Sequence, residues 1–364
     1  MQAFNAKSLP LDPSALRLET FLDELINATA KLEVYESKLN DSKLDPRWFL
    51  PTLQRKEALA SSLLEGTQAT LDGVFLDQVS PDPSDKSLRE VSNYIQATVY
   101  GYNTLAVEKK FSIGLIKGLH ETLMVGDVHK RKGITVGDFR TSQNYIGKLN
   151  SNKSITYVPP VPEQVLPLME NLIQYINFPG DKLKPLIRTA IIHAQFETIH
   201  PFDDGNGRVG RIMIPLYLCL EKKISLPCFF ISEALERDKF KYYTLLNDIR
   251  TKGNWSEWIK FFLQTVVSQC EKYISLVSKI NALYDQDLQR AKGLVRSSKI
   301  VDVVNLLYEY PIITTKEIVD RTEISHASAI RYLNSLSEGR MIFSDGKSRY
   351  RTYYYYDLIN LLKE

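Results

Sequence analysis

A twelve-residue stretch between two apolar helical segments constrains this chain more than any other feature of its sequence. Apolar residues recur at helical spacing in 188–199 before the stretch and in 212–220 after it. The stretch itself, 200–211, reads HPFDDGNGRVGR. Its glycines let the backbone approach a ligand closely and turn N–H groups outward, beside the positive end of the following helix. The sequence therefore predicts a mainly helical fold with an anion-binding bend between two helices.

The side chains of this bend fit one kind of ligand. Arg208 and Arg211 can each grip phosphate oxygens through two N–H groups, and Asp204 with phosphate oxygens makes a usual Mg²⁺ shell. His200, at the start of the bend, is free to act as a base. A glycine-rich turn with a structural histidine and surface arginines is the alternative. The combination favours a polyphosphate bound with Mg²⁺.

The stretch closely resembles the signature of the Fic family, HPFx[DE]GNGRxxR, at every specified position. The resemblance implies a protein adenylyltransferase, which transfers AMP from ATP to a Ser, Thr or Tyr hydroxyl of a target protein. It implies that His200 takes the hydroxyl proton and that Asp204 is the Mg²⁺ ligand. The residues that it implies for phosphate binding are Asp204, Gly205, Asn206, Gly207, Arg208, Val209, Gly210 and Arg211.

A second motif, SSLLEG at 61–66, lies at the end of an expected helix. Ser61 and Glu65 are four residues apart and therefore share a helix face. Taken alone, Glu65 reads as a surface residue at a frayed helix end. The segment also resembles the inhibitory motif [ST]xxxE[GN] of Fic proteins that carry their inhibitor on an N-terminal helix, the class II arrangement. The resemblance implies that Glu65 pairs with Arg211 and blocks the γ-phosphate pocket, because a bound carboxylate occupies the donors that a phosphate needs.

Two strand-like segments, 143–146 and 155–158, flank a polar turn at 147–153 and predict a β-hairpin. A surface loop is the alternative. The segment resembles the Fic flap, which docks a target protein as an added strand, here over about 143–158. In that arrangement Ile146 and Gly147 would close over the nucleotide.

Residues 232–251 read as one helix with a capped start, and it carries two adjacent tyrosines. Such a pair usually provides one core and one surface residue. The Fic resemblance implies aromatic walls for adenine and ribose at this place, which favours Tyr243 first and Tyr242 second. Arg250 stands where the family often has an amide that contacts adenine, so this sequence departs from the family there.

Apolar spacing and caps indicate further helices. His120, in one of them, reads as a core or capping histidine. A helix after residues 12–14 precedes a polar break at 40–46, and Pro51 is expected to open the next helix, which ends near Gly66. The other expected helices cover 88–105, 112–123, 162–175, 183–199 and 254 to about 290.

The tail, 299–364, reads as a separate unit of three short helices and a β-hairpin, which resembles a winged helix. The third helix, 325–336, would then be the one that reads a DNA groove. DNA binding stays open there beside dimerisation and protein docking. The residues able to contact DNA are His326, Ser328, Arg331 and Asn334 on the third helix, with Arg340, Lys347, Arg349 and Arg351 around the wing.

The length of 364 residues predicts two or three units, which we place at 1–87 (regulatory helices), 88–290 (Fic core) and 296–364 (winged helix). The net charge of +3 is too small to imply nucleic-acid or membrane binding by itself. No run is long and apolar enough for a membrane helix, and no signal peptide is expected. Three cysteines without a CxxC pattern indicate free thiols in a reducing cytosol, hence a cytoplasmic protein.

Two other functions remain as alternatives to adenylyl transfer. The chain can be a hydrolase that removes AMP from targets, with Glu65 aligning a water molecule, or a DNA-binding regulator that uses the Fic core as a nucleotide sensor. Modification of the chain by itself and a homo-oligomer also stay open. The sequence gives neither the target protein nor the signal that displaces Glu65.

Overall fold

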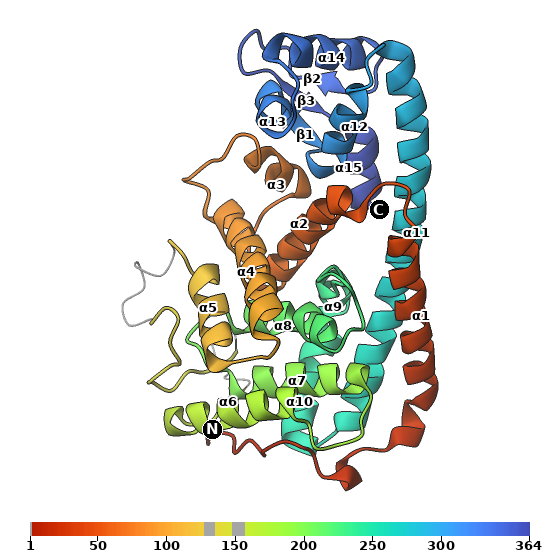
Figure 1. Cartoon of the computed structure of the whole chain (residues 1–364). Helices are drawn as coiled ribbons and strands as arrows, with labels where there is room; N and C mark the ends of the chain where they lie inside the picture. Colours follow the sequence, from red (N-terminus) through yellow and green to blue (C-terminus); the bar gives the residue numbers. More distant parts are fainter. Residues whose placement is uncertain (1, 127–134, 148–156) are drawn as a thin grey trace. The chain divides into compact units, whose positions relative to one another are not determined.

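The structure, a computed structural model, describes residues 2–126, 135–147 and 157–364. Over these residues the fold is mostly helical, as predicted, with one small sheet (Figure 1). Two 3₁₀ turns, Pro13–Ala15 and Leu18–Thr20, come first. The elements that follow are α1 (Leu22–Asn40), α2 (Pro46–Glu65), α3 (Leu71–Asp77), α4 (Lys86–Glu108), α5 (Ile113–Leu123), α6 (Pro162–Asn177), α7 (Pro185–Ile199), α8 (Asn206–Leu220), α9 (Ser232–Arg237), α10 (Lys239–Lys252), α11 (Trp255–Leu294), α12 (Ile300–Glu309), β1 (Ile312–Thr314), α13 (Thr315–Arg321), α14 (His326–Glu338), β2 (Phe343–Ser344), β3 (Thr352–Tyr354) and α15 (Tyr356–Lys363).

The chain divides into two compact units. Unit 1 comprises residues 1–33, 60–67 and 92–270, and unit 2 comprises residues 34–59, 68–91 and 271–364. The division falls inside α1, α2, α4 and α11. It differs from the three consecutive domains expected from the sequence, whose boundaries stay a prediction.

The N-terminal helices differ from the sequence-based expectation at their starts. The first regular helix begins at Leu22 rather than after residues 12–14, and α2 begins at Pro46, which leaves Pro51 inside it. Proline inside a helix removes one hydrogen bond, but α2 buries Phe49 and Leu53 on both sides of Pro51. The gain from this burial keeps the helix continuous.

The predicted end of α2 at Gly66 is confirmed. Gly66 has φ of +98°, its N–H donates to the Leu63 carbonyl at 3.0 Å, and the Thr67 N–H donates to the Ser62 carbonyl at 3.1 Å. This is a Schellman motif, in which a left-handed glycine satisfies the last helical carbonyls. It fixes Glu65 at the very end of the helix.

Helix α7 forms the centre of unit 1. Its side chains are buried from Leu186 to Ile199 apart from Arg188, which is the pattern of a helix surrounded by protein. It contacts α6, α8 and α10, and α5 packs against α6 and α8 (Figure 1). A buried helix of this kind gives a rigid support for the residues at its end.

The segment predicted as one helix over 232–251 is two helices. α9 ends at Arg237, and α10 starts at Lys239 after Asp238, whose ψ of 29° is not helical. The N-cap of α9 is Ile231, which makes no side-chain cap hydrogen bond, and Ser232 is the first helical residue. The predicted start of the following helix near Trp255 is confirmed.

Unit 2 contains the three helices and the hairpin expected in the tail. Ser325 caps α14 by accepting a hydrogen bond from the Ser328 N–H, as predicted. Strand β3 pairs antiparallel with β2, and also with β1, which was not expected, so the sheet order is β1-β3-β2. Helix α15 was also not expected. The assignment of this unit to the winged-helix class stays a prediction.

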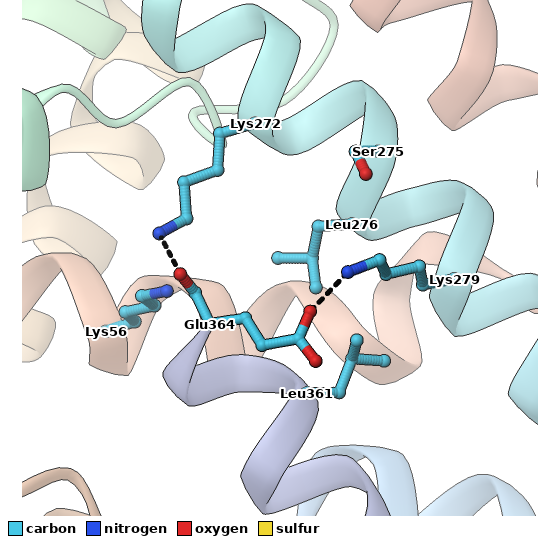
Figure 2. A pocket seen from close by; sticks show the side chains of 7 residues that line it. All are labelled: Lys56, Lys272, Ser275, Leu276, Lys279, Leu361 and Glu364. Carbon is cyan, nitrogen blue, oxygen red and sulfur yellow. Dashed lines mark hydrogen bonds and ion pairs between the residues drawn. The ribbon is translucent and has the colours of Figure 1, made fainter.

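The last residue of the chain lies against α11 in unit 2. Figure 2 shows Glu364 between Lys272 and Lys279. Lys272 donates to its backbone oxygen at 2.8 Å, and Lys279 pairs with its carboxylate. The surrounding pocket of about 180 Å³ is lined also by Leu276 and Leu361. Ion pairs as exposed as this one contribute little to stability, so the apolar contacts do more to hold α15.

Two remaining expectations concern the environment of the chain. Within the described ranges, no helix is both long and apolar enough to cross a membrane. Cys219, Cys228 and Cys270 are not joined by disulfide bonds.

Candidate active site

The bend between α7 and α8 is shorter than expected. α7 ends at Ile199 and α8 already begins at Asn206, so the bend is 200–205 and the rest of the signature is helical. Both of its ends are left-handed, with φ of +50° at His200 and +75° at Gly205. Gly205 adopts this conformation without strain, whereas His200 does so at a cost that its surroundings must offset.

Asn206 closes the bend from inside. Its side-chain oxygen accepts from the Phe202 N–H and its side-chain N–H group donates to the Phe202 carbonyl, both at 2.8 Å. The side chain of Asn206 therefore holds the shape of the bend. Only the backbone N–H of Asn206 is left to bind a ligand. The Gly205 N–H donates to Asp204 Oδ1 at 2.7 Å. The first turn of α8 presents further backbone N–H groups, the usual place for a phosphate.

Arg211 is buried on α8 and is bound by the segment 61–66, which resembles the Fic inhibitory motif. Its Nε donates to Ser61 Oγ at 2.8 Å, and its Nη2 donates to the Ser61 carbonyl at 2.9 Å and to Glu65 Oε1 at 2.6 Å. A Cβ built on Gly207 would overlap Glu65 Oε1. The carboxylate of Glu65 therefore lies directly over the glycine and the arginine of the signature, as the sequence predicted.

The charges of this pair shift both pKa values in the direction of a persistent ion pair. Burial raises the pKa of Glu65, but the charge and the hydrogen bond of Arg211 outweigh burial and hold it below its usual value. Burial lowers the pKa of Arg211, and the Glu65 charge raises it to a net value above the ordinary one. Both groups therefore stay ionised at neutral pH.

His200 lies at the C-terminal end of α7 and is only partly buried. Burial lowers its pKa well below the ordinary value, and the charge of Arg250 adds to this effect. The imidazole is therefore neutral at pH 7, which is the state that a proton acceptor needs. Its Nδ1 lies 3.9 Å from Glu197 Oε2.

Arg208 is buried beside Asp204 and Met124. Its Nη2 lies 3.7 Å from Asp204 Oδ1 and 3.8 Å from the Met124 sulfur. The side chain of Asp204 is 38% exposed. Among the described residues, no group of three or more His, Cys, Asp or Glu side chains could hold a metal ion. A single exposed carboxylate does fit Mg²⁺ that arrives with a nucleotide, since phosphate oxygens and water supply the other ligands.

Not every signature residue faces the bend. Val209 is buried in the core, and a Cβ on Gly210 would meet Glu197, Phe196 and His193 of α7 instead of solvent. Gly210 therefore lies on the side of α8 that faces α7, and the phosphate-binding role that the resemblance implies for Val209 and Gly210 stays a prediction.

The two tyrosines of α10 divide as expected into one core and one surface residue. Tyr242 is buried, and its hydroxyl lies 2.9 Å from His193 Nε2. Tyr243 is 42% exposed and lies next to the end of α2, its hydroxyl 3.5 Å from the Leu64 carbonyl. This favours Tyr243 over Tyr242 as a surface that a ligand can reach.

Arg250 is occupied by protein groups. Its guanidinium lies 3.9 Å from the centre of the Tyr157 ring, and it donates to the Glu197 carbonyl at 3.0 Å and to Thr198 Oγ1 at 3.3 Å. Tyr157 in turn donates to the Thr198 carbonyl at 2.7 Å. Arg250 thus fastens one arm of the expected hairpin to the end of α7.

The expected hairpin is described only at its base. Ile146 and Tyr157 form an antiparallel bridge with N···O distances of 2.9 and 3.0 Å. Gly147 follows Ile146 with φ of +147°. Residues 148–156, which include the predicted turn and most of the second arm, lie outside the described residues.

Two residues that the sequence did not mark as functional support the bend. The His120 ring stacks on Phe202 with centroids 3.8 Å apart. Its Nδ1 accepts from the Gly137 N–H at 3.0 Å, so its Nε2 carries the proton and donates to the Asp204 carbonyl at 3.2 Å. Burial lowers the pKa of His120 to about 4, which keeps it neutral. The expectation of a core or capping histidine is confirmed.

Arg140 is the second support. Its side chain is buried and, among the described residues, donates to four backbone carbonyls, those of His200 at 2.8 Å, Pro160 at 2.5 Å, Ser142 at 3.3 Å and Ile199 at 3.4 Å. Its own N–H donates to the Pro201 carbonyl at 2.9 Å. These bonds hold the left-handed backbone at His200. No local sequence pattern could have revealed them, because the partners at the end of α7 and in the bend lie about 60 residues away.

The fold and the site together define a helical protein whose bend between α7 and α8 carries the Fic signature. Two family models match the chain, that of the Fic/DOC family over residues 110–218 and that of the Fic/DOC family N-terminal region over residues 22–103. Together they match just over half of the chain. The chain belongs to the Fic/DOC family.

Curated relatives are similar at low identity. A protein adenylyltransferase Fic of Drosophila willistoni is 25% identical over 259 residues, which cover 69% of this chain and 46% of that protein. One of Aedes aegypti is 26% identical over 225 residues, covering 62% of this chain and 40% of the relative. Protein adenylyltransferase fic-1 of Caenorhabditis briggsae is 29% identical over 113 residues, which cover 29% of this chain and 21% of that protein. The chain thus spans less than half the length of these relatives.

Solved structures share the fold. A Fic family protein from Desulfovibrio desulfuricans superposes with a TM-score of 0.61 at 20% identity, over 96% of this chain and 98% of its own. Fic-1 from C. elegans gives a TM-score of 0.53 at 17% identity, over 72% and 74%. At these identities the likeness concerns the fold alone.

Proposed function

We propose that this chain is a protein adenylyltransferase that moves AMP from ATP to a hydroxyl side chain of a target protein and is inhibited by its own Glu65. The observation that carries the proposal is the position of Glu65, whose carboxylate occupies the donors of Arg211 over Gly207. A carboxylate bound there mimics the charge and the bonds of a terminal phosphate. The names of the curated relatives support the same reaction class.

The residues of the bend can each serve one part of the reaction. The amides at the start of α8 and the Arg208 side chain would hold the phosphates, and Arg211 would hold the γ-phosphate once Glu65 has left. Mg²⁺ bound with the nucleotide at Asp204 would neutralise charge on the phosphate oxygens. The main contribution to the rate is positioning and charge stabilisation.

The chemical step follows from the neutral His200. The target hydroxyl oxygen attacks the α-phosphorus, the bond from that phosphorus to the β-phosphate oxygen breaks, and pyrophosphate leaves. The hydroxyl proton passes to His200 Nε2. Losing this base typically costs on the order of 10²–10⁴-fold in rate. The target would dock on the segment 143–158, as the family resemblance implies.

Labelled ATP tests the proposal directly. The Glu65→Gly variant is incubated with Mg²⁺, a cell extract and ATP labelled either at the α- or at the γ-phosphate, and intact-mass spectrometry follows the chain itself. Label from the α-phosphate alone, lost when His200→Ala is added, is the expected result. Label from the γ-phosphate, or α-label that survives His200→Ala, would contradict adenylyl transfer through this base. Loss of AMP from a pre-modified target would favour the hydrolase instead.

A further inference from the structure

Glu197 is a buried glutamate one helical turn before His200, and the Fic signature does not include it. Its side chain is in the core of unit 1, and among the described residues its Oε1 has no hydrogen-bond partner. Its Oε2 lies 3.9 Å from His200 Nδ1, a buried nitrogen that also lacks a partner there. Buried polar atoms without partners are costly, so an unpartnered ring nitrogen 3.9 Å from a carboxyl group whose other oxygen is also unpartnered calls for an explanation.

The neighbouring helix leaves room for this carboxyl group. A Cβ on Gly210 of α8 would lie 2.6 Å from Glu197 Oε1 and 3.1 Å from Phe196 Cδ1. Glycine in the middle of a helix costs about 1 kcal/mol relative to alanine. Since Gly210 faces α7 and not the bend, accommodation of Glu197 is the physical reason for a glycine at this position.

Charged groups from every surrounding helix act on Glu197. Arg211 on α8 and Arg250 on α10 favour its carboxylate, Glu65 on α2 disfavours it, and the Tyr242 hydroxyl and His200 lie in the same cluster. Burial is the largest effect, and it raises the pKa of Glu197 to about 7. Departure of Glu65 removes a negative charge and therefore favours the carboxylate.

We propose that Glu197 is a positioning residue for His200, whose Nδ1–H donates to the Glu197 carboxylate once Glu65 is displaced. A neutral imidazole has one donor and one acceptor nitrogen, and an acceptor at Nδ1 leaves Nε2 as the base. A carboxylate there also stabilises the imidazolium that forms. The backbone carbonyl of Glu197 also raises the pKa of His200 and already accepts from Arg250, whereas the carboxylate can add a negative charge beside the imidazole.

The geometry requires only a small movement. Closing 3.9 Å to a charge-assisted hydrogen bond of about 2.8 Å is within reach of a side-chain rotation. The inference rests on the proposed function, because it assigns a partner to the base of that reaction.

Nitrogen NMR of the histidine rings tests the inference without relying on AMP transfer. The chain has five histidines, so ring-¹⁵N labelling gives few signals, and His200→Ala assigns the one of interest. The measurement compares Glu65→Gly with the double variants that add Glu197→Ala or Glu197→Gln. Glu221→Gln is the matched control, since Glu221 is a partly buried glutamate of unit 1 that pairs with Arg188 at 2.9 Å.

The expected result is an Nδ1-protonated His200 in Glu65→Gly and in the Glu221 control, with a shift toward the Nε2-protonated tautomer in the Glu197→Ala variant. The rate of AMP transfer should fall about 10–100-fold in that variant, the usual effect of losing an orienting partner, with little change in KM for ATP. In Glu197→Gln the amide oxygen can still accept, but the imidazolium loses its counter-charge. The acid limb of the kcat/KM profile should therefore move to lower pH.

An unchanged tautomer in Glu197→Ala together with an unchanged acid limb in Glu197→Gln would overturn the inference. If the Glu197→Ala variant does not fold, the nearly isosteric Glu197→Gln variant provides the test. Its two measurements are the acid limb of the kcat/KM profile and the pH titration of the His200 ring nitrogens. If Glu65→Gly transfers no AMP while the tautomer still depends on Glu197, the proposed function fails and the positioning role stands.

Discussion

In the proposed function, Arg211 is the residue at which inhibition by Glu65 and binding of the γ-phosphate would exclude each other. It is a buried cation whose hydrogen bonds within the described part of the chain go to the end of α2, to the hydroxyl and carbonyl of Ser61 and to the carboxylate of Glu65. The side chain of Glu65 itself keeps 34% of its surface exposed. Glu65 can therefore leave toward solvent, whereas Arg211 stays in place.

Replacing Glu65 by glycine should activate the chain. A hydrogen bond to a charged group contributes about 1.5–3 kcal/mol, so its removal should raise the rate of AMP transfer by about 10–100-fold. Initial rates with α-labelled ATP measure this. Glu108→Gly is the matched control, because Glu108 is also the last residue of its helix, α4, and is exposed. Equal activation by both variants would mean that a loosened helix end, and not the freed Arg211, raises the rate.

Arg140 should matter for the rate as well as for stability. Arg140→Lys keeps the charge but loses the planar fork that reaches several carbonyls, including that of His200. In the Glu65→Gly background we expect at least about a tenfold slower transfer and a free energy of unfolding lower by about 1–3 kcal/mol. Arg188→Lys, which affects the pair with Glu221, should lower stability alone. A parental rate in Arg140→Lys would refute its role in holding His200.

At this scale the sequence predicted what lies in motifs and missed what depends on long-range contacts. The pairing of Glu65 with Arg211 followed from two motifs, and the structure brings these residues together. The support of the bend by Arg140 and the contact of Glu197 with His200 Nδ1 could not be read from spacing. Glu197 precedes His200 by one helical turn, which is common for a glutamate. It stands out only because the structure buries it on α7.

At the level of elements, the fit of α8 against α7 depends on Gly210. Replacing an interior helical glycine by alanine usually stabilises a protein by up to about 1 kcal/mol. Gly210→Ala should instead destabilise, by about 1–3 kcal/mol, because the new methyl group meets Glu197 and Phe196. Gly293→Ala on α11 has open space and should be neutral or stabilising. Chemical denaturation measures the free energy of unfolding of both variants. If alanine changes it in the same direction at both positions, the close approach of α8 to α7 at Gly210 is contradicted.

Asp287 of α11 gives unit 2 a dependence on pH. Tyr308 and Tyr355 both donate to its Oδ2, the former at 2.7 Å. Burial raises its pKa from 3.8 to about 6, against the hydrogen bonds of the two tyrosines. The folded chain thus keeps this proton to a higher pH than the unfolded chain. Its contribution to stability is full below the unfolded pKa and is lost as pH rises through about 6.

Asp287→Asn should consequently raise the free energy of unfolding at about pH 8, by about 1–3 kcal/mol. The gain should shrink as pH is lowered toward about 5, where the wild-type carboxyl is protonated. Denaturant titrations of both proteins at the two pH values measure this difference. A gain that is the same at both pH values would show that the carboxyl does not titrate in this range.

Helix boundaries were predictable where a local cap sets them and not elsewhere. Ser112 and Ser325 cap α5 and α14, and Gly66 ends α2, as their sequences indicate. The early start of α8 depends on the left-handed Gly205, and the break at Asp238 has no cap that could mark it. Strand β1 is only three residues long and exists by pairing with β3, a contact that its own sequence does not encode.

For the whole molecule, family membership and helical architecture followed from one signature, whereas the division into units did not. Residues 60–67 are separated from their sequence neighbours and belong with the unit that carries the bend. This grouping follows from the bonds of Ser61 and Glu65 to Arg211, which cross about 150 residues of sequence. In the sequence, only the resemblance of 61–66 to the Fic inhibitory motif indicated that this segment lies at the bend.

The central claim is that Arg211 takes the γ-phosphate of ATP when Glu65 is absent. A crystal structure of Glu65→Gly with Mg²⁺ and a non-hydrolysable ATP analogue measures this most directly. We predict phosphate oxygens on the Arg211 guanidinium and on the first-turn amides of α8, with the α-phosphorus facing His200 Nε2. An empty bend in crystals saturated with the analogue, or a triphosphate bound away from Arg211, would contradict the account.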